Sequence, residues 1–182
     1  GQDIGAYLLL TFDANTPEEL DAMIEQAGEL VLEAGAMDVL VADTPAKLKD
    51  AWAARSSFLE AIMEETKLLD ECDVVLPVNK IADYLEFVNK TGEECGLVIK
   101  SFGHAGDGNL HIYQCSNDLA EDEFKKRVDT FFEKIYKEAI NCGGLVSGEH
   151  GIGSGKIKYL AESIGEVNMN LMEGIKKVFD PK

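Results

Sequence analysis

The chain has 182 residues and a formal net charge of −17 at pH 7, from 34 acidic and 17 basic side chains. Such a charge excludes a sequence-independent nucleic-acid surface, and an anionic membrane would repel it, so we expect neither kind of partner. No apolar run is long enough to span a bilayer and the first residues lack the pattern of a signal peptide, which predicts a cytoplasmic protein without a transmembrane segment.

The first third of the chain has the pattern of a strand–helix–strand unit followed by a helix. Thr16 and Pro17 are a typical helix start, and Gly35 is a typical helix end. A further helix begins at Pro45, and its apolar positions continue as far as Ile62. The expected elements are a buried strand over 6–12, a helix over 17–34, a short strand over 39–42 and a helix over 45–62.

The rest of the chain mixes strands and helices around one hairpin. The residues Gly106 to Asn109 are of types that favour a tight turn, and they lie between two apolar, β-branched runs. The expected elements are a strand over 74–78, a helix from 81 that ends at Gly92, strands over 97–102 and 110–113, a helix over about 119–140, an extended piece over 145–147 and a last helix over 171–179. This order predicts an α+β fold over 1–182, a ferredoxin-like α/β sandwich with an antiparallel sheet and helices packed on one face.

The three histidines of the chain all lie in two short glycine-rich segments. His104 and His111 flank the predicted turn, and Glu149 and His150 lie in the segment 147–153. A turn can bring His104 and His111 to one point, and with Glu149 they form a His₂Glu set, which leaves a metal position open for catalysis. The alternative is that each histidine is an ordinary hydrogen-bonded residue.

The two histidine segments carry a resemblance to a known family. Gly-His-Ala-Gly-Asp-Gly-Asn-Leu-His at 103–111 and Ser-Gly-Glu-His-Gly-Ile-Gly at 147–153 resemble the C-terminal domain of FAD-linked oxidases. That family includes D-lactate dehydrogenase, the glycolate oxidase FAD subunit and D-2-hydroxyglutarate dehydrogenase. Ala-Trp-Ala-Ala-Arg at 51–55 is similar to the Trp-x-x-Arg helix of the family. The resemblance covers nearly the whole chain but only part of such an enzyme.

The resemblance implies a role for each candidate residue. His104, His111 and Glu149 would hold a divalent metal, Zn or Mn, that orients a small 2-hydroxy acid, and His150 would be the catalytic base. Arg55 would clamp the substrate carboxylate, although a surface ion pair with Glu60 or Asp50 is an open alternative. Tyr113 would either contact the substrate or pack in the core.

The resemblance also implies cofactors and partners. The substrate would be oxidised to the 2-oxo acid by FAD, which is bound mainly by an N-terminal domain that this chain lacks, so we expect the chain to be inactive alone. The expected partners are that flavin-binding domain and an electron-transfer protein or quinone acceptor. The full enzyme could then be peripheral to the inner membrane.

Two other functions remain open from the residues themselves. A His₂Glu zinc site also activates water, so a free-standing metallohydrolase is one alternative, although the chain has no His-Glu-x-x-His helix. A non-catalytic ligand-binding module is the other. Detection of a bound metal would distinguish the two enzymes from the non-catalytic module. Detection of a flavin requirement would distinguish the oxidoreductase from the hydrolase.

Overall fold

The computed structural model describes residues 5–181 and divides into two units, Gly1–Ser56 and Ser57–Lys182. The first unit holds helices α1 (Pro17–Glu33) and α2 (Pro45–Ser56). The predicted cap of α1 is confirmed, because the Thr16 hydroxyl accepts a hydrogen bond from the Glu19 N–H at 3.2 Å.

The strands predicted over 6–12 and 39–42 are wrong. Both segments are irregular and almost wholly exposed in the first unit. Their apolar composition favours a strand, but a strand also needs a hydrogen-bonded neighbour, and neither segment has one among the described residues.

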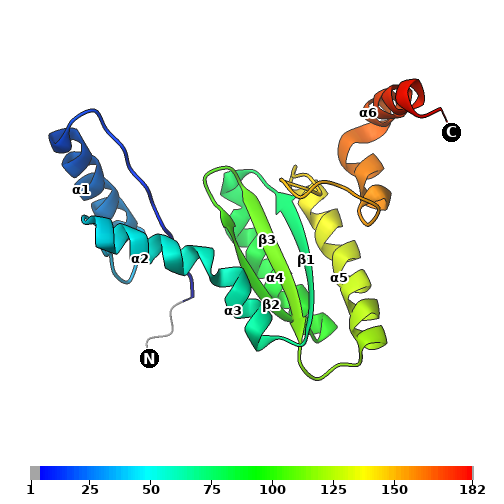
Figure 1. The fold of residues 1–182 in the computed structure, drawn as a ribbon, viewed down its shortest axis with the longest axis horizontal. Coiled ribbons are helices and arrows are strands. Elements are labelled where there is room, and N and C mark those ends of the chain that lie inside the picture. The colour runs from blue at the N-terminus through cyan, green and yellow to red at the C-terminus, as the bar shows by residue number, and fades with distance from the viewer. Residues whose placement is uncertain (1–4, 182) are drawn as a thin grey trace. The chain divides into compact units, whose positions relative to one another are not determined.

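The second unit carries most of the regular structure and all of the sheet (Figure 1). Its elements are α3 (Phe58–Glu65), β1 (Leu68–Val75), the short 3₁₀ helix η1 (Val78–Lys80), α4 (Ile81–Cys95), β2 (Val98–His104), β3 (Asn109–Ser116), α5 (Glu121–Asn141) and α6 (Ile157–Phe179). The predicted hairpin and the predicted helix over 119–140 are therefore present, while the last helix starts earlier than expected.

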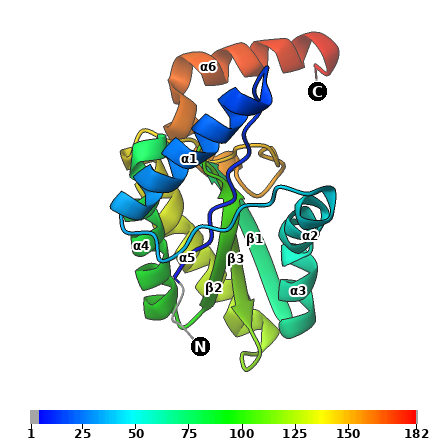
Figure 2. The ribbon, with the colours of Figure 1, turned by 90° about the vertical axis from the view of Figure 1, so that its left-hand side faces the viewer.

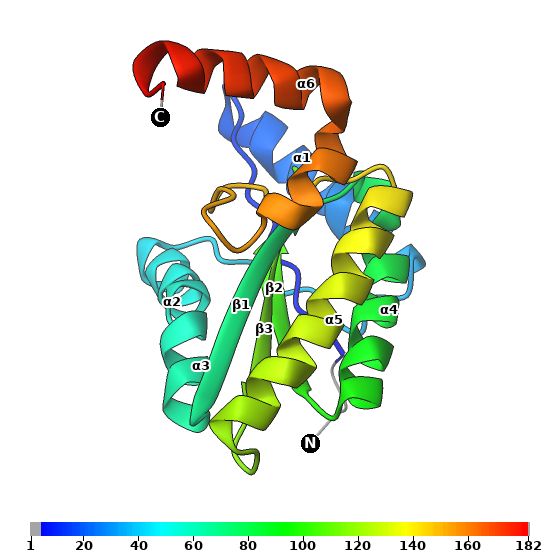
Figure 3. The ribbon, with the colours of Figure 1, turned by 90° about the vertical axis from the view of Figure 1, so that its right-hand side faces the viewer.

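The sheet has the order β1-β3-β2, and both pairings are antiparallel, which confirms the α+β class. Helices α4 and α5 cover one face, while the short α3 packs on the other face through Ile62. Figures 2 and 3 show the strands between α3 on one side and α4 with α5 on the other. The core on the α4–α5 side includes Cys72, Val74, Leu110, Ile112, Val88 and Phe131.

Two predicted boundaries differ from the structure for reasons of packing. The helix expected over 45–62 is two helices, because Ser57 between them leaves helical geometry at φ −89° and ψ 2°. Ile62 is buried against the sheet, whereas Leu48 and Trp52 in the first unit are about half exposed. Helix α4 does not end at Gly92 but continues to Cys95, and Gly96 ends it in the left-handed conformation at φ 65°. Gly92 is instead buried within the helix.

Gly92 allows a close approach between α4 and β2. A Cβ atom built on Gly92 would lie 2.9 Å from Ile99 Cδ1 and closer still to Ile99 Cγ1. The glycine is therefore explained by helix–strand packing rather than by helix termination. Within residues 5–181, no helix combines the length and the apolar character needed to cross a membrane.

Candidate functional site

The β2–β3 hairpin places His104 and His111 on one face of the sheet. Phe102 is the register partner of His111, and His104 lies two residues farther along β2, so the two histidines are diagonal neighbours. Their ring centroids are 5.8 Å apart. The hairpin turn that joins them is closed by a hydrogen bond from the Gly108 N–H to the His104 carbonyl at 3.0 Å. The structure thus brings the two histidines together as the turn predicts.

The loop between α5 and α6 brings Glu149 to the same place. Leu145 pairs with Val75 at the end of β1 through two backbone hydrogen bonds of 2.8 and 3.1 Å, and this contact starts the loop beside the sheet. Glu149 Oε1 lies 3.0 Å from His111 Nε2 and 3.9 Å from His104 Nε2. One potential ligand atom from each of these three residues lies within 4.8 Å of the others.

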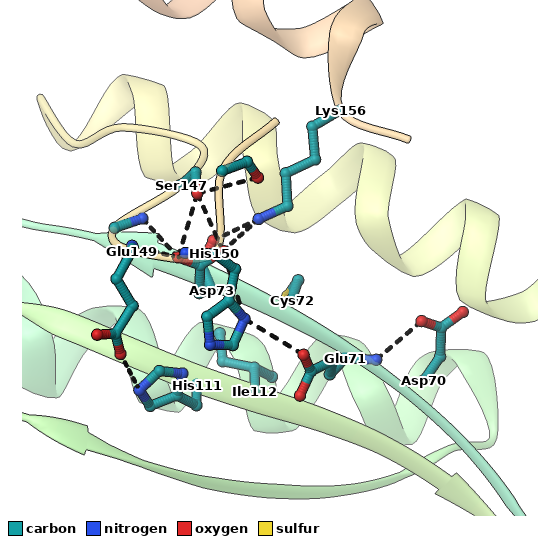
Figure 4. A network of polar contacts seen from close by, with 12 residues as sticks. Asp70, Glu71, Cys72, Asp73, His111, Ile112, Ser147, Glu149, His150 and Lys156 are labelled. Carbon is teal, nitrogen blue, oxygen red and sulfur yellow. Dashed lines mark hydrogen bonds and ion pairs between the residues drawn. The ribbon is translucent and has the colours of Figure 1, made fainter. Parts of the chain in front are cut away.

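His150 lies beside this cluster and not in it. Its ring stacks on His111 with centroids 4.9 Å apart and 29° between the planes. Its Nδ1 atom is 3.2 Å from Glu71 Oε1 on β1, a contact drawn in Figure 4. This contact uses Nδ1 and leaves Nε2 as the ring nitrogen that does not face Glu71.

Burial affects the protonation of His111. This residue is only 6% exposed. Burial and, next, the neighbouring His150 imidazole lower its pKa, so the neutral form is favoured. Neutral imidazole is the form that binds a metal. Its Nδ1 atom has no hydrogen-bond partner within the described part of the chain.

Asp73 organises the loop that carries Glu149 and His150, and sequence reasoning missed it. Its Oδ2 accepts hydrogen bonds from the N–H groups of residues 148, 149 and 150 at 2.7, 2.7 and 3.0 Å. The Ser147 hydroxyl donates to the same carboxylate at 3.2 Å, and Lys156 forms an ion pair with it (Figure 4). Burial alone would raise the pKa of Asp73, but the His150 N–H and Lys156 outweigh it and hold that pKa well below its usual range.

A signal for Asp73 and Glu71 exists in the sequence. They alternate with the buried Cys72 and Val74, which is the pattern of a strand with one polar face. The strand predicted from the sequence begins only at 74, because the acidic residues interrupt the apolar run. Strand β1 in fact begins at Leu68, and these two carboxylates lie on the same face as His111 and Tyr113.

The structure places Tyr113 and Arg55 differently from the metal-binding candidates. Tyr113 is 3% exposed, and its ring stacks on that of Phe102 with centroids 5.1 Å apart. In this structure Tyr113 therefore packs in the core. Arg55 lies in the last turn of α2, in the first of the two units, whereas the three candidate ligands lie in the second. A contact of either residue with substrate remains a prediction.

A hollow of about 350 Å³ opens beside the cluster. It is lined by Val75, His104, Asp107, Asn109, Gly148 and Glu149. Asp107 supports its wall, because Asp107 Oδ1 accepts a hydrogen bond from the Asn109 N–H at 3.0 Å. The hollow therefore adjoins two of the three potential ligands and has room for a small organic acid.

The sequence of the chain matches a known protein family along its whole length. All 182 residues, 1–182, match the family described as FAD linked oxidases, C-terminal domain. The chain belongs to the FAD-linked oxidase family. This FAD-linked oxidase domain is 63% identical over 181 residues to a D-lactate dehydrogenase of Anaerostipes hadrus, in a match that covers 100% of this chain and 38% of the relative.

Two further relatives of this FAD-linked oxidase domain are more distant. The glycolate oxidase subunit GlcD of Bacillus subtilis is 30% identical over 185 residues, covering 100% of this chain and 39% of the relative. A D-2-hydroxyglutarate dehydrogenase of Stutzerimonas stutzeri is 29% identical over 182 residues, covering 98% and 39%. The domain thus spans less than two fifths of the length of these relatives.

Proposed function

We propose that this domain forms the substrate side of a flavin-dependent dehydrogenase that oxidises a small 2-hydroxy acid of the D-lactate or glycolate kind to the 2-oxo acid. The observation that carries the proposal is the convergence of His104, His111 and Glu149 beside the stacked ring of His150. The names of the relatives, which include D-lactate dehydrogenase and glycolate oxidase, support the substrate class. The FAD would be bound mainly by a domain outside this chain and would accept the hydride.

The residues of the site fit a divalent cation. Two imidazole nitrogens and one carboxylate oxygen are donors that suit Zn²⁺ or Mn²⁺, and their mutual separation within 4.8 Å allows one ion to contact all three. The same sheet face also carries the carboxylate of Glu71, which would repel an anionic substrate. A cation held by His104, His111 and Glu149 would offset this repulsion and, as a Lewis acid, lower the pKa of the substrate hydroxyl.

The chain's own residues would then move the proton. His150 Nε2 accepts the hydroxyl proton, and the Glu71 carboxylate near Nδ1 stabilises the imidazolium that forms. His111 holds the His150 ring in place by stacking on it. Arg55, if the first unit brings it near the hollow, would bind the substrate carboxylate through its planar guanidinium.

The test uses the full-length protein that carries this domain, loaded with FAD. Anaerobic mixing with D-lactate, glycolate or D-2-hydroxyglutarate should bleach the flavin absorbance, and a chelator should slow the bleaching. Glu149→Gln should lower the bleaching rate at least about tenfold. Glu93→Gln, an exposed position on α4, should leave it unchanged.

Two results would contradict the proposal. The first is a wild-type flavin that none of the three acids reduces. The second is a Glu149→Gln protein that is reduced as fast as the wild type. Hydrolytic activity without any need for flavin would favour the metallohydrolase instead.

A further inference from the structure

Asp73 is a carboxylate that is wholly inaccessible to solvent, at the end of β1 next to the candidate site. A buried charge is costly unless it is paired and hydrogen-bonded. Within residues 5–181, every hydrogen-bond and ion-pair partner of this carboxylate comes from one segment of the chain, the loop 147–156 between α5 and α6. The partners are the N–H groups of 148, 149 and 150, the Ser147 hydroxyl, the Lys156 ammonium and, at 4.0 Å, the Nδ1 atom of His150.

Two of the three N–H donors belong to the residues that carry the proposed chemistry. The backbone nitrogens of Glu149 and His150 lie 2.7 and 3.0 Å from the same oxygen of Asp73. Three successive N–H groups that point at one oxygen define the backbone path of a loop that has no regular structure. Because the backbone is held in this way, the two side chains diverge, with Glu149 toward His111 and His150 toward Glu71.

Lys156 ties the other end of the loop to the same carboxylate. Its side chain is 14% exposed, and its ammonium also donates to the Asp73 carbonyl at 3.3 Å. It is the residue directly before α6. Both ends of the loop are therefore attached to β1 at a position whose register partner on β3 is His111.

We propose that Asp73 is a positioning residue for the reaction, which holds residues 148–150 so that Glu149 and His150 face the cation and the substrate. The inference rests on the proposed function. It differs from a merely structural role for Asp73, because a structural role would change stability but not the geometry of the metal site in the protein that remains folded.

The experiment compares Asp73→Asn with Asp70→Asn, a matched control on the same strand, in the full-length protein. Cobalt(II) is the probe, because its visible absorption reports ligand geometry. In Asp73→Asn the amide NH₂ group replaces the carboxylate oxygen that pairs with the Lys156 ammonium. The ammonium then has no opposite charge at this position, so the loop should shift. We expect Co²⁺ affinity and kcat at saturating substrate to fall at least about tenfold, with an altered Co²⁺ spectrum. Asp70→Asn should match the wild type in Co²⁺ affinity, in kcat and in its Co²⁺ spectrum.

A double variant separates loop positioning from the ion pair. In Asp73→Asn with Lys156→Met, the amide oxygen can still accept the three N–H groups and no unpaired charge is buried. Its Co²⁺ affinity should lie between those of Asp73→Asn and the wild type. If Asp73→Asn alone does not fold, the double variant is compared with the wild type, and equal Co²⁺ affinity, spectrum and kcat in the two would overturn the inference.

Two outcomes would overturn the inference, and they are distinguishable. If the wild type binds Co²⁺ and the Asp73 variants have its spectrum, affinity and kcat, the positioning role is wrong and the proposed function stands. If the wild type itself neither binds Co²⁺ nor oxidises a 2-hydroxy acid, the proposed function fails and the positioning role fails with it.

Discussion

At the scale of single residues, the site combines buried and exposed groups of the same type. His111 is nearly buried, whereas the side chain of His104 is about half exposed and that of His150 somewhat less. The buried ring is held by packing against Phe102 and His150, while the other two rings are partly exposed to solvent. This arrangement suits a site with one rigid ligand and an accessible base.

Replacing Glu71 tests whether His150 acts as the base. Glu71→Gln keeps the size of the side chain but removes the charge that faces His150 Nδ1 at 3.2 Å. The imidazolium formed during proton transfer would be less stable, so kcat in the flavin-loaded protein should fall about tenfold while KM changes little. Steady-state kinetics measures the effect, with Glu64→Gln on the exposed side of α3 as control. An unchanged kcat would contradict the role of Glu71.

Replacing Gly148 tests how tightly the loop fits the hairpin. A Cβ atom at this position would lie 2.6 Å from Asn109 Cγ and closer still to its Oδ1. Gly148→Ala should therefore lower the free energy of unfolding by about 1–3 kcal/mol and weaken Zn²⁺ binding, because the loop must move away. Gly155→Ala in the same loop, where a Cβ meets nothing within 4 Å, is the control and should be close to neutral. Urea unfolding and Zn²⁺ titration measure the pair, and equal behaviour of the two variants would contradict the close fit.

At the scale of elements, the hairpin and the two helices behind it form a rigid support for the site. Strand β3 is buried along its whole length between β1 and β2. Helix α4 packs close to β2 because Gly92 has no side chain where Ile99 lies. The strand that carries His104 is therefore held from behind by α4, and from its edge by β3.

Two helix glycines should respond in opposite directions to the same change. Gly92→Ala on α4 places a methyl group against Ile99 and should destabilise the protein by about 1–3 kcal/mol. Gly174→Ala on α6, where a Cβ meets nothing within 4 Å, should stabilise it by about 0.5–1 kcal/mol through helix propensity. Denaturant unfolding of the two variants gives both signs. A stabilising Gly92→Ala would mean that α4 can move away from β2 without loss.

At the scale of the whole molecule, the acidic surface and the site respond to pH in different ways. The net charge of −17 is spread over a largely exposed set of carboxylates. The site instead contains two groups whose pKa values are lowered in the folded state, His111 and Asp73. For both groups the unfolded chain binds protons more readily than the folded chain. Each group therefore lowers the free energy of unfolding once the pH falls below the pKa that the group has in the unfolded chain.

The metal-free protein should therefore lose stability on mild acidification because of His111. The loss should begin below about pH 6.5, the pKa of an unfolded histidine, and continue down to the lower pKa of the folded state. In this window one proton accounts for a slope of up to about 1.4 kcal/mol per pH unit. His111→Gln should reduce the slope of unfolding free energy against pH, measured by urea unfolding in the presence of a chelator. An identical slope in the variant would show that His111 titrates normally in the fold.

Much of the site could be predicted from the sequence because its signals are local. The turn residues between His104 and His111 predict a hairpin that can bring both rings to one point, and the structure has this hairpin. The helices over 17–33 and 121–141 follow from apolar periodicity in the same way. The strands expected over 6–12 and 39–42 failed because strand formation depends on a partner elsewhere in the chain.

The sequence by itself determined the family and the α+β class, and it indicated the candidate ligand and base residues, since each depends on residue types at short spacings. Only the tertiary structure decided that Glu149 meets the hairpin histidines and that Asp73 holds the loop that carries Glu149 and His150. The reason is physical. The hydrogen bonds between Asp73 and the loop join residues 74 to 83 positions apart, and contacts of that range arise only when β1 and the loop are packed together.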